Sequence, residues 1–327
     1  MRSAVFAGLL AVALGHEQDG AVVATWLGRV QGVEGETSRG SPYVRFNRVP
    51  YAEAPVGPLR LRDPVAKLPW RGVLDGAAAT PKCPQTDLLT GNATGQEDCL
   101  FLNIYTPRLP QLGIFSTSLK PVMLWIHGGG FTLGDATELT NPELLVDEDV
   151  VFVAIQYRLG LLGWLAREND PVLPGNLGLK DQQEAMRWVQ RNIAFFGGDP
   201  RKVTIFGESA GAISAHLHIL SPAARNLFRA AILQSGTALM GYERLVHTPK
   251  AKSGEEAVRA LGCQEDTLAC LQDLDLGTFL EPVGLIGDQQ WPVQVGEAIH
   301  LPSQVTCCPR TPRRLDQCCP STPWSSW

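Results

Sequence analysis

The stretch Val203-Thr-Ile-Phe-Gly-Glu-Ser-Ala-Gly-Ala-Ile-Ser214 decides how this chain folds. Its first four residues form an apolar run typical of a buried strand, and its alanine-rich end is typical of a helix. Between the two, Ser209 has a glycine two positions away on each side. That spacing favours a sharp strand-to-helix turn from which the serine hydroxyl projects above a sheet. We therefore predict an α/β fold in which Ser209 is a nucleophile.

A second glycine-rich stretch, Trp125-Ile-His-Gly-Gly-Gly-Phe131, lies upstream of the serine. Glycines let the backbone approach a substrate carbonyl closely because no Cβ intervenes. We expect the N–H groups of Gly129 and Gly130, with that of Ala210 at the start of the new helix, to form an oxyanion hole. His127, just before the glycines, is predicted to hold this loop in place rather than to act as a base.

Other segments extend this pattern into a sheet with helices. Short apolar runs predict buried strands at residues 121–126, 150–157, 203–206 and 230–234. Apolar residues at three- to four-residue spacing predict a helix over 179–196, which the following Gly-Gly-Asp-Pro sequence ends. Strands that alternate with helices predict a mostly parallel sheet flanked by helices, with reactive groups at the carboxyl ends of its strands.

Composition and charge limit the classes of molecule that this protein could bind. The 327 residues, 44% hydrophobic and 19% charged, are enough for one large α/β domain. The net charge of −5 is spread without a basic stripe, which argues against a nucleic-acid partner. The apolar segment 150–166 contains Gln156 and Arg158, so no membrane anchor is predicted. A small-molecule substrate that is not a polyanion is expected.

The amino terminus predicts secretion. Residues 1–15 combine an early arginine, an apolar run and a small-residue ending, as in a signal peptide, although a buried first helix is an alternative. Asn92 begins an Asn-Ala-Thr glycosylation sequon in a Gly/Thr/Asn-rich stretch, which is typical of an exposed loop. A secreted, glycosylated protein is the expectation.

The cysteines fall into two groups. Cys83 and Cys99 flank the sequon loop, and Cys263 and Cys270 bracket a short polar turn. An oxidising compartment favours two local disulfides, with buried free thiols as the alternative. Their spacing does not suit a metal site, so neither a metal nor a cofactor is expected. Residues 304–327, rich in cysteine and proline and without apolar periodicity, are interpreted as a disordered tail outside the domain.

A serine nucleophile needs a general base, and none can be assigned from the sequence. His216 and His218 lie too far along the helix that follows Ser209 to reach its hydroxyl. Glu208 is expected to point away from the serine as a buried hydrogen-bonding group. The remaining histidines offer only weak candidates: His16 at the predicted processing site, and His247 and His300 in poorly patterned segments.

The motifs together resemble the carboxylesterase and cholinesterase family of the α/β-hydrolase fold. The resemblance covers about Ala21 to Leu271 and includes, besides the two glycine motifs, the sequences VPYAEAPVG, EDCLFLN, YRLG, GNLGLKDQ, WVQRNIAFFGGDP and QSG. It implies Ser209 as nucleophile, Gly129, Gly130 and Ala210 as oxyanion hole, and disulfides between Cys83 and Cys99 and between Cys263 and Cys270. It also implies a carboxylic ester hydrolase that needs no cofactor and forms an acyl-enzyme.

The resemblance also has departures. In that family the triad acid and histidine follow well after the nucleophile, in segments that this sequence does not match. We therefore expect residues 16–303 to be the N-terminal part of an α/β-hydrolase domain, with activity far below that of a complete enzyme. No tryptophan lies between Cys83 and Cys99, so a quaternary-ammonium substrate is not supported. Two alternatives stay open, an inactive cholinesterase-like binding or adhesion protein and a nonfunctional truncated product.

Overall fold

The structure is a computed structural model that describes residues 21–87, 89–110, 119–137, 142–167, 170–239 and 250–280, without the side chains of 250–253. The predicted signal peptide at 1–15 and tail at 304–327 lie outside the described residues, as do His16, His247 and His300.

The chain alternates strands with helices for most of its length. The strands are β1 (Val22–Ala24), β2 (Arg29–Gln31), β3 (Val33–Glu36), β4 (Pro42–Pro50), β5 (Val73–Asp75), β6 (Gln85–Thr86), β7 (Ala93–Thr94), β8 (Phe101–Thr106), β9 (Lys120–Ile126), β10 (Val151–Ile155), β11 (Gly198–Glu208) and β12 (Ala230–Gln234). The α-helices are α1 (Pro142–Val146), α2 (Gly160–Trp164), α3 (Leu177–Asn192), α4 (Ala210–Leu220), α6 (Lys250–Ala260), α7 (Thr267–Asp273) and α8 (Leu276–Leu280). Three short 3₁₀ helices are η1 (Gly57–Leu59), η2 (Ile193–Phe196) and η3 (Pro222–Ala224).

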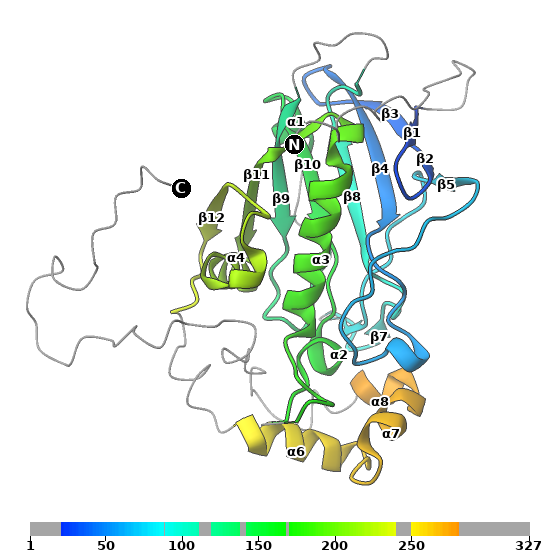
Figure 1. The fold of residues 1–327 in the computed structure, drawn as a ribbon, viewed down its shortest axis with the longest axis vertical. Coiled ribbons are helices and arrows are strands. Elements are labelled where there is room, and N and C mark those ends of the chain that lie inside the picture. The colour runs from blue at the N-terminus through cyan, green and yellow to red at the C-terminus, as the bar shows by residue number, and fades with distance from the viewer. Residues whose placement is uncertain are drawn as a thin grey trace, which may run out of the picture.

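A seven-stranded sheet in the order β12-β11-β9-β10-β8-β4-β3 forms the centre of the molecule (Figure 1). The pairs β12/β11, β11/β9 and β9/β10 are parallel, which confirms the parallel arrangement predicted for the four apolar runs. The pairs β10/β8, β8/β4 and β4/β3 are antiparallel. The sheet is therefore mixed, and its parallel half carries Ser209.

Two boundaries differ from the sequence-based expectation. The helix predicted over 179–196 is α3 followed by the tighter η2, and Gly197 ends it with φ 87°. Strand β11 begins at Gly198, five residues before the predicted strand, because Gly198 already pairs with Lys120 of β9. The register then shifts before Val203 pairs with Val122, so the Gly-Gly-Asp-Pro segment forms an irregular start of the strand.

The core lies between the sheet and the helices that cross it. All five residues of β10 are buried, as expected for the middle strand of the seven, which has neighbours on both sides. Helix α3 runs lengthwise across the sheet with α4 beside it (Figure 1), and α3 buries Trp188 and Met186. A smaller cluster around Trp125, Phe152 and Phe206 belongs to the alternate side chains of β9, β10 and β11, which point to the opposite face of the sheet.

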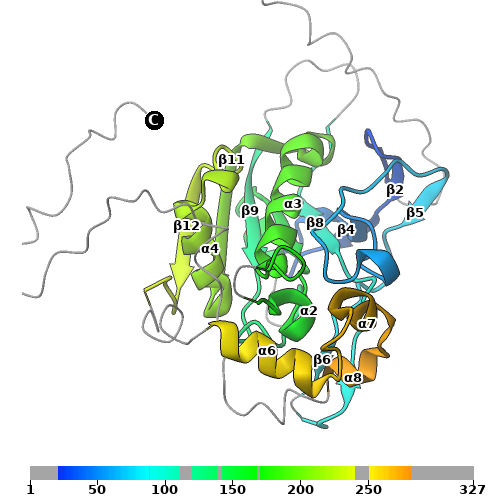
Figure 2. The same ribbon diagram turned by 60° about the horizontal axis from the view of Figure 1, so that its bottom comes forward.

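Two buried ion pairs connect distant segments of the fold. Arg158, after β10, forms a bidentate pair with Asp181 of α3, at 2.8 and 2.6 Å. Arg60 pairs with Glu97 at 2.6 Å and donates to the carbonyl groups of Leu271 and Leu274, so it holds the end of α7 against the loop after η1. Figure 2 shows α6, α7 and α8 grouped at the end of the molecule that also holds α2. No helix in the described part of the chain combines the length and apolar character needed to cross a membrane.

Candidate active site

Ser209 lies at a sharp turn between the carboxyl end of β11 and the first residue of α4. Its backbone has φ 53° and ψ −118°, a conformation that side-chain-bearing residues rarely adopt. Two hydrogen bonds hold it there: its N–H donates to Gln234 O, and its carbonyl accepts from Ile213 N, both at 2.9 Å. Ser209 itself is half-buried. The strand, turn and helix predicted around the serine are thus present.

The glycines around the serine are required by close packing. A Cβ on Gly211 would lie 2.0 Å from Ile126 O, and one on Gly207 would lie 2.5 Å from the carbonyl carbon of Gly211. A Cβ on Gly236, after β12, would come within 2.5 Å of Ser209 O. The turn can therefore be this tight only because β11, α4 and the segment after β12 each place a glycine against it.

The second glycine stretch follows β9 and lies directly beside the serine. A Cβ on Gly128 would be 3.4 Å from Ser209 Cβ. Gly129 and Gly130 have φ values of 100° and 62°, so this loop follows a path open mainly to glycine. Within the part of the chain that the structure describes, the N–H groups of Gly129, Gly130 and Ala210 donate to no other protein group. The structure thus places the loop that carries Gly129 and Gly130 beside Ser209, and the three N–H groups have no partner among the described residues.

His127 is buried among loop atoms and does not contact Ser209 by any hydrogen bond. Its Nδ1 is 2.9 Å from Gly128 O, and its ring stacks on Tyr157 with 4.2 Å between centroids. The Tyr157 hydroxyl donates to His127 O at 2.8 Å. Burial lowers the pKa of His127 to about 4. A neutral imidazole that packs against the loop agrees with the structural role predicted for it.

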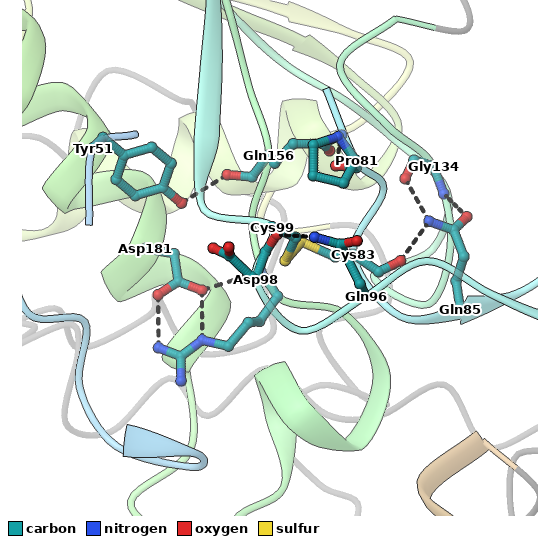
Figure 3. The surroundings of a disulfide bond; sticks show 11 residues. Tyr51, Pro81, Cys83, Gln85, Gln96, Asp98, Cys99, Gly134, Gln156 and Asp181 are labelled. Atoms are coloured by element: carbon teal, nitrogen blue, oxygen red, sulfur yellow. Dashed lines mark hydrogen bonds and ion pairs between the residues drawn. A yellow bond between two sulfur atoms is a disulfide. The ribbon is translucent and has the colours of Figure 1, made fainter. Parts of the chain in front are cut away.

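Gln85 is a site residue that the sequence did not reveal. Its side-chain oxygen accepts from Gly134 N at 2.9 Å, and its side-chain nitrogen donates to Gly134 O at 2.9 Å and to Cys83 O at 3.0 Å (Figure 3). Gly134 is packed against the His127 ring, since a Cβ there would be 2.6 Å from Nδ1. Gln85 therefore ties the disulfide loop to the loop that carries Gly129 and Gly130.

The two histidines of α4, His216 and His218, form hydrogen bonds with residues other than Ser209. His218 is buried and its Nε2 is 2.7 Å from Gln182 Oε1, and burial lowers its pKa to about 3. His216 Nδ1 accepts a hydrogen bond from Ala238 N at 3.0 Å. Neither forms a hydrogen bond with Ser209, in agreement with their predicted distance along the helix.

Glu208 differs from its expectation. It is half-buried rather than buried, and its carboxylate has no hydrogen-bond partner among the described residues. Its Oε2 lies 2.8 Å from the position of a Cβ on Gly128, so it faces the glycine loop. A carboxylate thus lies beside the loop that follows β9.

Both expected disulfides are present. Cys83 and Cys99 have Cα atoms 5.0 Å apart and are fully buried, and Cys263 and Cys270 have Cα atoms 5.5 Å apart. Asn92 is exposed in the loop that the first disulfide closes, between β6 and β7. Among the described residues no three histidine, cysteine or acidic side chains come together as metal ligands.

Comparison with known proteins identifies the family. A family model described as "Carboxylesterase family" matches residues 19–297. The chain belongs to the carboxylesterase family. The α/β-hydrolase fold implied by the sequence is likewise confirmed by a solved structure, the juvenile hormone esterase of Manduca sexta with OTFP covalently attached. That structure has a TM-score of 0.75 and 35% identity, and the match covers 83% of this chain and 52% of that one.

Curated relatives of this carboxylesterase-family chain are esterases and hydrolases. Acylcarnitine hydrolase of Mus musculus is 46% identical over 207 residues, which are 60% of this chain and 36% of the relative. Esterase FE4 of Myzus persicae is 43% identical over 238 residues, 72% of this chain and 41% of the relative. The chain therefore matches about half or less of the length of these relatives.

Proposed function

We propose that this chain carries the nucleophile and oxyanion hole of a serine carboxylesterase. The observation that supports this most directly is the strained turn at Ser209 beside the glycine loop. The N–H groups of Gly129, Gly130 and Ala210 have no partner among the described residues. A strained, half-exposed serine next to free backbone donors suits acyl transfer rather than a structural role. The juvenile hormone esterase structure, which carries covalently attached OTFP, supports a covalent mechanism for this fold.

In the proposed reaction, Ser209 Oγ attacks the carbonyl carbon of a small-molecule ester while a base takes its proton. The negative charge that develops on the carbonyl oxygen is held by the three N–H groups. The bond to the alkoxy group then breaks, the alcohol leaves with the proton, and an acyl-enzyme remains. Water attacks the acyl carbon in the same way, which releases the carboxylic acid and restores the serine.

The general base is the missing part of this proposal. No hydrogen bond joins His127, His216 or His218 to Ser209 in the described part of the chain, so the proposed base and its orienting carboxylate are other residues. Loss of a triad member leaves only what the oxyanion hole and binding supply, roughly 10³- to 10⁴-fold over water.

We further propose that the protein is secreted and carries a glycan on Asn92. The signal-peptide pattern, two disulfides and an exposed sequon all support an oxidising, extracellular location.

The test is covalent labelling with a fluorophosphonate, followed by peptide mass spectrometry. We expect the label on Ser209 alone, slowly but well above other serines, and none in Ser209→Ala. Ser38→Ala, at an exposed serine, is the matched control and should label normally. Labels spread over several serines, or unchanged labelling of Ser209→Ala, would disprove the proposal.

A further inference from the structure

A cavity that does not include Ser209 lies between the β1–β2 turn and the carboxyl end of α3. It has a volume of about 370 Å³ and is lined by residues of the β1–β2 turn and of the carboxyl end of α3, including Trp26, Trp188 and Arg191. Helix α3 ends where η2 leads into the start of β11, whereas Ser209 follows the far end of that strand. With 11 residues at about 3.3 Å each, β11 spans roughly 33 Å from its first residue to its last.

The walls of the cavity are largely aromatic. Trp188 is 2% exposed and forms the inner wall, whereas Trp26 is 63% exposed at the rim. Trp26 is not loosely attached, because its ring meets Phe195 edge to face at 5.6 Å. The Thr25 hydroxyl, moreover, accepts from Leu27 N at 3.1 Å and so fixes the turn. An exposed indole on a fixed turn suits contact with a flat apolar group.

Two buried polar atoms on the cavity residues have no partner among the described residues. They are Trp188 Nε1, a donor, and Asn192 Oδ1, an acceptor. Asn192 is 2% exposed, and its side-chain nitrogen donates to Trp188 O at 3.0 Å, which leaves the amide oxygen free. Buried polar groups are normally satisfied, and Trp188 Nε1 is a donor that a polar occupant of the cavity could use.

The charge around the cavity is positive. Its lining includes Lys67 and Arg191 and no carboxylate. Lys67 is paired with Glu53 at 2.7 Å, but Arg191 shares Glu184 with Arg187. The Arg191 contact is the longer of those two, 3.6 Å against 3.1 Å, and its side chain is 58% exposed. The Arg191 guanidinium therefore has no close carboxylate partner of its own at the entrance of the cavity.

We propose that this cavity is a second binding site, for a small aromatic carboxylate. The flat ring would lie between the indoles of Trp26 and Trp188, and the carboxylate would meet the Arg191 guanidinium, which donates to carboxylates in pairs. A volume of this size lies within the range of small-molecule sites. The lining holds no serine, cysteine or histidine, so the site binds without reacting.

The test uses isothermal titration calorimetry of the full 327-residue chain with 2-naphthoate. We expect saturable micromolar binding that weakens about tenfold in Arg191→Gln and in Trp26→Ala, because each removes one of the two contacts. Arg191→Lys, which keeps the charge, should lose less than Arg191→Gln. Arg225→Gln and Leu89→Ala, at exposed positions outside the cavity, are the matched controls and should bind normally.

Three results would overturn the proposal. The first is the absence of saturable binding up to millimolar 2-naphthoate. The second is binding that Arg191→Gln and Trp26→Ala leave unchanged, which would place the ligand elsewhere. The third is equal affinity for the neutral 2-naphthalenemethanol, which would show that the cavity does not recognise the carboxylate. Both variants alter exposed side chains, and circular dichroism verifies that they fold.

Discussion

At the scale of single residues, Ser209 is held in a backbone conformation that works against its own stability. A residue with a Cβ at φ 53° and ψ −118° stores on the order of 1–3 kcal/mol of strain, which the surrounding hydrogen bonds and packing must offset. The strain follows from the need to direct the hydroxyl away from the sheet while α4 begins at the next residue. Position 209 therefore favours reactivity over stability.

Removing the Cβ at this position should relieve the strain. We predict that Ser209→Gly raises the free energy of unfolding by about 1 kcal/mol, since glycine adopts such angles freely. Ser209→Ala is the matched control, because it removes the hydroxyl but keeps the Cβ. Urea denaturation of both variants tests this, and equal stabilities of the glycine and alanine variants would contradict the strain argument.

The buried histidines should make the fold sensitive to acid. Burial lowers the pKa of His127 to about 4 and that of His218 to about 3, below the ordinary value near 6.5. The unfolded chain therefore binds more protons than the folded one in the window below pH 6.5. Stability is fully present above that pH and is lost as the pH falls toward 4, by about 3 kcal/mol for His127 alone.

This second prediction can be checked by urea denaturation between about pH 7 and pH 5. His218→Gln, which keeps a hydrogen-bonding partner for Gln182, should lose stability less steeply with falling pH than the unaltered chain. Parallel pH profiles for the two proteins would show that His218 is not responsible.

At the scale of elements, the site depends on the connection between two loops that are far apart in sequence. Gln85 of β6 satisfies both the N–H and the C=O of Gly134, across 49 residues, much as a neighbouring strand would. Because Cys83 is bonded to Cys99 and also accepts from Gln85, the disulfide loop and the glycine loop form one assembly (Figure 3).

Loss of this connection should loosen the glycine loop. We predict that Gln85→Ala lowers the free energy of unfolding by about 2 kcal/mol, because Gly134 N and O lose their partner in a partly buried place. Gln96→Ala is the matched control, since Gln96 is exposed and makes one bond, to Asp98 O. Thermal and urea unfolding give the comparison, and equal effects of the two variants would contradict the role of Gln85.

The strands and turns that could be predicted were those whose structure depends mainly on the residues next to them in the sequence. The apolar run of β10 and the Gly-x-Ser-x-Gly turn carry their structure in neighbouring residues. Strand β4 could not be found this way, because its sequence PYVRFNRVP mixes charged and apolar residues and, apart from Phe46, its fully buried residues are confined to its end. Gln85 likewise has no local signal, since its role depends on a contact with Gly134 that only the fold creates.

At the scale of the whole molecule, the sheet is well covered at its centre and poorly covered at one edge. Strand β10 is buried throughout, whereas β12 has alternating exposed residues, with Ile232 44% exposed. In the described part of the chain, β12 pairs only with β11, so its outer backbone groups lack strand partners. Such an edge is a template for pairing with another chain.

We predict concentration-dependent self-association of the purified chain through this edge. Ile232→Lys should shift the sedimentation profile toward the monomer, because a charge on an edge strand disfavours pairing. Leu89→Lys adds the same charge at a residue that is 97% exposed and distant in sequence from β12, and it serves as the matched control. A profile that neither substitution changes would place the contact elsewhere, and a monomer at all concentrations would contradict the prediction.

Both glycine motifs lie between residues 125 and 214, and this position has a consequence for folding during synthesis. Strands β9, β10, β11 and β12 pair with one another, and their carboxyl ends supply Ser209 and its neighbouring loop. During vectorial synthesis on a ribosome, every residue of this half-site has therefore been added once Gly236 has emerged. The nucleophile and its anion-binding loop can thus assemble as a cotranslational unit, before any later segment of the polypeptide has left the exit tunnel.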